Sequence, residues 1–103
     1  MADYAADIAK YTTDVDEEKV KKIVTYCGIA LRNRDSSLVS AGDPKELATV
    51  RDGFAAKKLG LSADEAEAAI AKVMETMAGV KAKSRVTVYY LLAEQTGTLD
   101  KLG

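Results

Sequence analysis

Hydrophobic side chains recur every three or four residues along most of the chain, which is the spacing of an amphipathic α-helix. The pattern predicts five helices, over about residues 2–13, 15–31, 44–59, 62–78 and 86–96. Only one proline interrupts the sequence, and several glycines fall where a helix would end. We therefore predict an all-α fold, a compact orthogonal bundle of about five short helices, with residues 1–103 forming a single helical domain.

Capping signals mark where several of these helices begin and end. Asp16 is expected to cap the second helix. The sequence Asp43-Pro44-Lys45-Glu46 offers a capping residue, a proline at the first helical position and a glutamate three residues after the cap. Ser62 and Glu65 repeat the capping-box pattern at the fourth helix. Gly60 is expected to end the third helix in the left-handed conformation.

The last apolar segment, Val86-Thr87-Val88-Tyr89-Tyr90-Leu91-Leu92-Ala93, is rich in β-branched and aromatic residues, which also favour strands. It lacks period-two alternation, the rest of the chain offers no convincing second strand, and it continues into a helix end at Gly97. We predict a helix that is apolar on most sides and is therefore buried among the others.

Between the second and third helices, residues 33–42 favour turns because they are rich in Asn, Asp, Ser and Gly. Leu38 and Val39 are the expected anchors of this stretch. The core is expected to contain the inward-facing apolar residues of all the helices. They are Ile8, Val20, Ile23, Val24, Cys27, Leu47, Val50, Phe54, Leu59, Leu61, Ile70, Val73, Met77, Tyr89 and Leu92.

The composition is that of an ordinary globular protein, with 48% apolar and 30% charged residues in a chain of 103. The chain contains no histidine. This excludes Ser-His and Cys-His nucleophiles, and it removes the commonest metal ligand and the proton shuttle that works near neutral pH. We expect no cofactor and no enzymatic activity, because no catalytic set of residues is visible.

The net charge of −1 lacks the basic surplus that drives non-specific binding to nucleic acids, so this charge counts against a nucleic-acid partner. The first residues carry neither the basic start nor the apolar stretch of a signal peptide. No apolar run approaches the roughly 20 residues of a membrane-spanning helix. We therefore expect a cytoplasmic protein with no membrane partner.

The sequence around Gly60 resembles the helix-turn-helix of bacterial transcription factors, with small residues before the turn and apolar positions on the second helix. In such proteins the second helix enters the major groove of DNA. Here its outward positions carry Asp64, Glu65 and Glu67, which phosphate groups would repel. We interpret the motif as a structural corner between two helices.

A set of basic residues offers a candidate surface for an anion or an acidic partner. It consists of Lys57, Lys58, Lys81, Lys83 and Arg85. The simpler interpretation of residues 81–85 is a solvated connector whose charges complement the C-terminal end of the preceding helix. The set nevertheless stays a candidate interaction surface.

Three weaker patterns each have a simpler explanation. The run Arg32-Asn33-Arg34-Asp35-Ser36-Ser37-Leu38 resembles the Asp-Ser-Leu site at which acyl carrier proteins receive phosphopantetheine, but a second serine interrupts it, and we interpret it as a polar loop. Cys27 lies at an inward helix position, so we expect a buried, inert thiol. The carboxylates do not follow the spacing of a known metal-binding loop, and no metal site is predicted.

Stretches along most of the chain resemble a small bacterial family described as all-α and known only as a domain of unknown function. They are Ile8-Ala9-Lys10-Tyr11, Cys27-Gly28, Glu46-Leu47-Ala48-Thr49-Val50, Phe54-Ala55-Ala56-Lys57-Lys58-Leu59-Gly60-Leu61 and Val88-Tyr89-Tyr90-Leu91-Leu92-Ala93. These are mainly core and turn residues. The resemblance implies a helical C-terminal segment and supplies no activity, cofactor or catalytic residue.

These observations favour a small non-enzymatic protein that acts by contact with another protein or in a structural role. Apolar stripes that extend beyond the core could reach a partner, and the sequence leaves open whether this is another protein or a second copy of the chain in a homodimer. Two alternatives remain. One is a nucleic-acid binder that uses the corner around Gly60, and the other is a small ligand carrier or enzyme that uses carboxylate, Tyr, Ser or Lys side chains.

Overall fold

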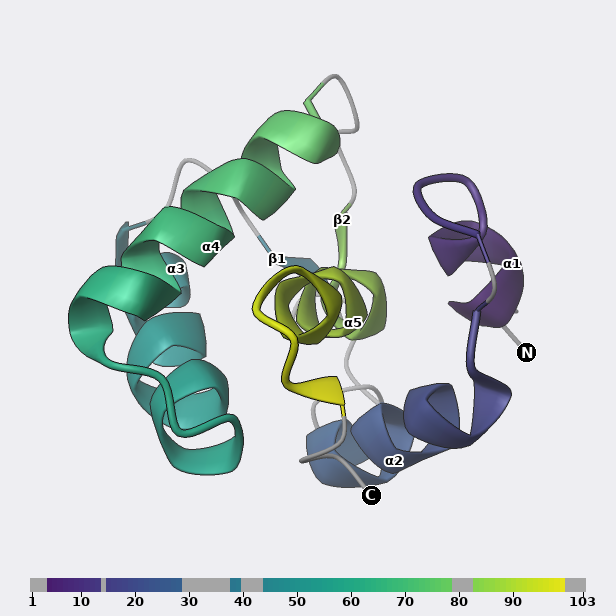
Figure 1. The fold of residues 1–103 in the computed structure, drawn as a ribbon, viewed down its shortest axis with the longest axis horizontal. Helices are drawn as coiled ribbons and strands as arrows, with labels where there is room; N and C mark the ends of the chain where they lie inside the picture. Colours follow the sequence, from purple (N-terminus) through teal and green to yellow (C-terminus); the bar gives the residue numbers. More distant parts are fainter. Residues whose placement is uncertain (1–3, 14, 29–37, 40–43, 79–82, 100–103) are drawn as a thin grey trace.

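The computed structural model describes residues 4–13, 15–28, 38–39, 44–78 and 83–99. Within these ranges the chain is helical almost throughout, which confirms the all-α prediction (Figure 1). The helical segments are α1 (Tyr4–Ile8), α2 (Glu17–Cys27), α3 (Pro44–Thr49), η2 (Val50–Lys58), α4 (Ala63–Thr76) and α5 (Arg85–Gln95). Because η2 continues α3 without a break, these segments correspond to the five predicted helices.

Helix α5 lies at the centre of the molecule, as predicted. Figure 1 shows it nearly end-on, with α1 and α2 on one side and α3, η2 and α4 on the other. All residues from Arg85 to Ala93 are buried, so the helix is enclosed on every side. A fully buried large apolar side chain stabilises the fold by roughly 1.5–3 kcal/mol. The buried apolar side chains of this helix therefore contribute substantially to the packing energy.

Polar bonds also hold α1 and α2 against α5. The Tyr90 hydroxyl accepts a hydrogen bond from the backbone N–H of Asp16 at 2.9 Å, at the start of α2. The Thr87 hydroxyl donates to the Asp7 carboxylate of α1. Thr12, just after α1, donates to Glu94 at 2.8 Å. The buried hydroxyls of α5 therefore have partners, which is the condition for placing them in an interior.

A short pairing of two strands precedes α5. Strands β1 (Leu38–Val39) and β2 (Lys83–Ser84) are antiparallel, with Val39 opposite Lys83. Val39 is only 2% exposed, so it anchors its stretch of chain as predicted. The sequence did not predict this pairing, because strands of two residues are too short to show an alternating pattern.

The capping signals are confirmed where the structure describes them. The Asp16 side chain accepts hydrogen bonds from the backbone N–H groups of Glu18 and Lys19 at 3.0 and 3.3 Å. Ser62 and Glu65 form both hydrogen bonds of the capping box at the start of α4. Gly60 has a φ of 70°, the left-handed conformation expected after the third helix. Asp43, the predicted cap of α3, lies outside the described residues.

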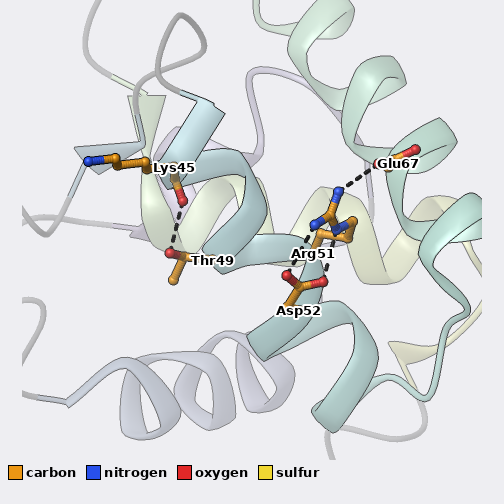
Figure 2. A network of polar contacts seen from close by, with 5 residues as sticks. All are labelled: Lys45, Thr49, Arg51, Asp52 and Glu67. Atoms are coloured by element: carbon orange, nitrogen blue, oxygen red, sulfur yellow. Dashed lines mark hydrogen bonds and ion pairs between the residues drawn. The ribbon is translucent and has the colours of Figure 1, made fainter.

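The third helix differs from the prediction because it widens into a π-helix after Thr49. Over Val50–Lys58 the backbone follows the i→i+5 pattern, and at its end Leu59 N–H donates to Phe54 C=O at 3.1 Å. At the junction, the Thr49 hydroxyl donates to Lys45 C=O at 2.9 Å (Figure 2), a contact that tends to bend helices. The inward positions Val50 and Phe54 are four residues apart, a spacing that suits an α-helix as well as this wider helix, so the apolar pattern did not reveal the change.

The core contains most of the predicted residues. Ile8, Val20, Ile23, Val50, Phe54, Leu59, Ile70, Val73, Met77, Tyr89 and Leu92 are buried. Val24, Cys27, Leu47 and Leu61 pack against this core but are only partly buried. Helix α1 is shorter than predicted, since a turn follows Ile8. None of the helices in the described part of the chain has the length and apolar character needed to span a bilayer.

Candidate functional site

A groove separates α4 from the rod formed by α3 and η2. It encloses about 500 Å³. Its lining is mainly apolar and comes from both helices. The lining residues are Leu47, Ala48, Arg51, Glu67, Ile70, Ala71 and Met74. Ile70 is buried at its floor, Leu47 and Met74 are half-buried, and Ala71 is exposed. The groove therefore presents apolar surface to the outside beside the core.

Arg51 and Glu67, which line the groove, belong to an ion-pair network that forms its charged edge. Figure 2 shows the contacts of this network. Arg51 donates from Nε and Nη2 to the two carboxylate oxygens of Asp52, at 2.9 and 3.1 Å. Its Nη1 donates to Glu67 on α4 at 2.6 Å. The hydrogen bonds from Arg51 hold the pKa of Asp52 below its usual value, and those to the two carboxylates raise the pKa of Arg51. Arg51 and Asp52 are therefore both charged at neutral pH.

An aromatic cluster lies where α2, η2 and α5 meet. The rings of Phe54 and Tyr89 stack with their centroids 4.0 Å apart, and Tyr26 packs at an angle against Phe54 at 5.4 Å. Tyr26 is 43% exposed, while the two stacked rings are buried. Lys58 Nζ lies 6.0 Å from the centre of the Tyr26 ring, at the outer limit for a cation–π contact. This cluster fills the space between elements and leaves Tyr26 as its exposed edge.

The predicted basic surface is altered by the burial of two of its members. Arg85 and Lys83 are only 7% and 8% exposed, so neither belongs to a solvated connector. Arg85 donates to the Tyr89 hydroxyl at 3.0 Å and forms an ion pair with Glu46 of α3. Lys57 is exposed and Lys58 is half-buried, while Lys81 lies outside the described residues. The described positions therefore do not form one exposed basic patch.

Cys27 is not an activated nucleophile. Burial raises the pKa of its thiol to about 11, although the nearby charge of Arg85 acts in the opposite direction. A thiol with this pKa is almost wholly protonated at neutral pH, and only the thiolate is reactive. The predicted inward position is confirmed, because Cys27 packs against the core, but the side chain is only partly buried.

The structure adds no support for the other candidate sites. Asp64, Glu65 and Glu67 are exposed on α4, so acidic groups cover the helix that would enter a DNA groove. Residues 32–37, which resemble a carrier-protein site, lie outside the described residues. In the part of the chain that the structure describes, no three His, Cys, Asp or Glu side chains are placed to hold a metal ion.

Comparison with known proteins now gives the family. Residues 3–100 match the model of a family described as protein of unknown function (DUF2853). The chain belongs to the DUF2853 family. The match confirms the predicted resemblance to a family of unknown function. A search of curated proteins gives no match to this DUF2853 chain.

The groove of this DUF2853 member was not predicted from the sequence, although one signal was present. On α4 the apolar positions extend beyond those needed for the core. Ala66, Ala69 and Val73 are buried inward, whereas Ala71 and Met74 lie further round the helix and line the groove. An apolar arc wider than the buried stripe could have indicated a second contact surface. The pairing of Arg51 with Glu67 could not be read from the sequence, because it depends on how η2 packs against α4.

Proposed function

We propose that this protein is a non-enzymatic interaction module that binds a helical segment of a protein partner in the groove between α3–η2 and α4. The observation that carries the proposal is the apolar lining of the groove beside a charged edge. Helix-in-groove recognition uses such a surface, with apolar anchors spaced three and four residues apart on the bound helix. Leu47, Ile70 and Met74 would contact those anchors.

The size of the side chains in the groove also supports a helical occupant. Ala48 and Ala71 lie on opposite walls, one on α3 and one on α4. Helices pack with their axes about 8–10 Å apart, and small side chains at the contact allow the closest approach. The charged edge formed by Arg51, Asp52 and Glu67 would orient the bound helix through polar contacts at the rim of the interface.

The π-helix is a second supporting observation. Segments of this type are rare and are found frequently at functional sites. Here η2 supplies Arg51 to the groove edge and buries Val50 and Phe54 on its other side. Its wider backbone sets the position of Arg51 relative to α4. A regular α-helix would place this side chain differently around the helix axis.

The test uses two matched arginine substitutions on α4. Ala71→Arg places a long charged side chain in the groove. Ala68→Arg makes the same change at an exposed position of the same helix that does not line the groove. The guanidinium introduced by Ala71→Arg would lie one turn from both Glu67 and Glu75, so the helix itself should be stabilised rather than weakened. Circular dichroism and thermal unfolding should show both variants folded.

Binding is then compared by affinity capture from cell lysate, with quantitative mass spectrometry, for the wild type and both variants. We expect a protein that is retained by the wild type and by Ala68→Arg, and that is depleted at least tenfold by Ala71→Arg. The recovered partner should also shift the amide NMR signals of Ala48 and Ala71. Equal capture profiles for all three proteins, together with a wild type that stays monomeric, would overturn the proposal.

We also propose that the protein acts in the cytoplasm. Cys27 is the chain's single cysteine, so no disulfide can form within the chain, and small secreted domains typically depend on disulfides. Cell fractionation with an antibody to the protein should recover it in the cytoplasmic fraction. Recovery in an extracytoplasmic fraction would contradict this assignment.

A further inference from the structure

We infer that the groove binds a second copy of this chain, so that the protein forms a two-fold symmetric dimer through α4 and the α3–η2 rod. This inference rests on the proposed function of the groove and names its partner. In a two-fold interface, the same surface of both subunits meets, so the surface must be complementary to itself. The groove meets this condition because each of its walls supplies apolar side chains and its edge carries charges of both signs.

The charged edge has the required arrangement. Arg51 belongs to η2 and Glu67 to α4, so the two signs lie on opposite walls of the groove. When the two grooves face each other, a two-fold axis that runs along the groove brings Arg51 of one subunit toward Glu67 of the partner subunit, and the same contact forms a second time. Opposite charges meet in both contacts, whereas a surface with charges of one sign would repel its own copy.

The two groups also have bonding capacity left for this contact. A guanidinium has five N–H donors, and Arg51 uses three of them on Asp52 and Glu67. Glu67 accepts this hydrogen bond through Oε1. Among the described residues, no partner is found for Oε2 of Glu67 or for the two remaining N–H groups of Arg51. A dimer would satisfy these groups without breaking the bonds within the subunit.

The apolar lining gives the dimer its hydrophobic contact. Ala71 is exposed one turn along α4 from Glu67, and Met74 is half-buried one turn further on. Across the groove, Leu47 and Ala48 are half-buried on α3. Interface cores typically combine such apolar contacts with a polar rim. The charged edge of this groove would form that rim.

The test uses two variants of the chain, each of which reverses one charge of the Arg51–Glu67 pair. Arg51→Glu leaves the groove edge with acidic groups only, and two copies of this variant would repel each other. Glu67→Arg places two arginines there and would repel its own copy in the same way. A mixture of the two variants brings acidic groups of one subunit against basic groups of the other in both contacts. Sedimentation velocity over a micromolar to millimolar concentration range measures the dissociation constant of each sample.

We expect the wild type to dimerise, each variant alone to dissociate at least tenfold more readily, and the equimolar mixture to regain affinity close to that of the wild type. Lys21→Glu and Glu75→Arg make matched charge reversals at exposed positions outside the groove. Each control alone should dimerise like the wild type, and mixing them should bring no gain. An ion pair that acts only within one subunit would give no recovery on mixing.

A wild type that stays monomeric throughout the concentration range, or a mixture no tighter than its separate components, would overturn the dimer. The proposed function has a separate readout. A monomeric wild type whose capture of a different protein is lost with Ala71→Arg would refute the dimer and support the groove as a binding site. A monomeric wild type with capture unchanged by Ala71→Arg would refute both.

Discussion

Two arginine–glutamate pairs join the α3–η2 rod to the rest of the molecule, and they differ mainly in burial. Arg85 and Glu46 have side chains that are 8% and 27% exposed, whereas Arg51 and Glu67 have side chains that are 30% and 58% exposed. Removing one partner of a buried pair leaves a desolvated group without compensation. An exposed pair is solvated by water and contributes little to stability. The buried arginine–glutamate pair at α5 therefore serves folding, whereas the exposed pair remains available for contact at the groove.

The two helices that carry these pairs differ in the same way. Helix α5 is buried along its whole first nine residues, while α4 is buried along one stripe and carries exposed residues on the rest of its surface. The packing around residues 85–93 of α5 leaves these residues no surface for a partner. The surface of α4 and the adjoining groove can change their contacts without disturbing the core. This contrast predicts that substitutions on the two sides will separate stability from binding.

The largest difference is expected from truncation of one apolar side chain on each helix. Leu92→Ala should lower the free energy of unfolding by about 2–5 kcal/mol, because Leu92 is fully buried in α5 and leaves a cavity. Met74→Ala should lower it by less than about 1 kcal/mol, because half-buried Met74 faces the groove and water can fill the space. Urea unfolding followed by circular dichroism measures both values. Equal losses would contradict the contrast between the two helices.

The next prediction compares the two arginines through substitution by methionine, which keeps the length of the apolar stem. Arg85→Met should destabilise the fold by about 2–3 kcal/mol, since Tyr89 and Glu46 lose their shared partner in a largely buried place. Arg51→Met should leave the unfolding midpoint within experimental error of the wild type. The effects of the two variants on dimerisation, measured by sedimentation, should be reversed. Arg51→Met should weaken dimerisation, whereas Arg85→Met, where it is folded, should dimerise like the wild type.

A smaller effect is expected from the thiol of Cys27, which lies near the buried Arg85. Burial raises the pKa of Cys27 from 9.0 to about 11, so the unfolded chain releases the thiol proton at lower pH than the folded chain. Its contribution to stability is fully present below pH 9 and decreases as the pH rises from 9 through 11. The wild type should therefore lose stability over this range faster than Cys27→Ala. Urea unfolding at intervals across this pH range measures the difference, and parallel curves for the two proteins would show that burial does not suppress ionisation.

Local signals in the sequence predicted much of the fold because they depend on near neighbours in the chain. The caps at Asp16 and Ser62, the left-handed Gly60 and the buried last helix each follow from a few adjacent residues. The π-helix could not be predicted in this way. Its hydrogen-bond pattern differs from that of an α-helix, but the spacing of four residues between Val50 and Phe54 occurs in both.

The candidate site was predicted less well because it depends on distant residues. The sequence placed Arg85 in a solvated connector, since its partner Glu46 lies 39 residues away. Its position at the start of an otherwise apolar helix, four residues before Tyr89, was the available signal of a buried role. Arg51 and Glu67 are separated by 16 residues and meet only when η2 packs against α4. The two arginines differ in burial, and burial is a property of the folded chain.

The most direct test of the account is a series of two-dimensional ¹H–¹⁵N NMR spectra of the wild type over a hundredfold range of protein concentration. Signals of the groove residues Ala48, Arg51, Glu67 and Ala71 should move with concentration, while those of the enclosed residues Val88 and Leu92 should stay in place. Spectra in which the groove signals do not move, or in which α5 moves as much as the groove, would contradict a dimer built on this surface.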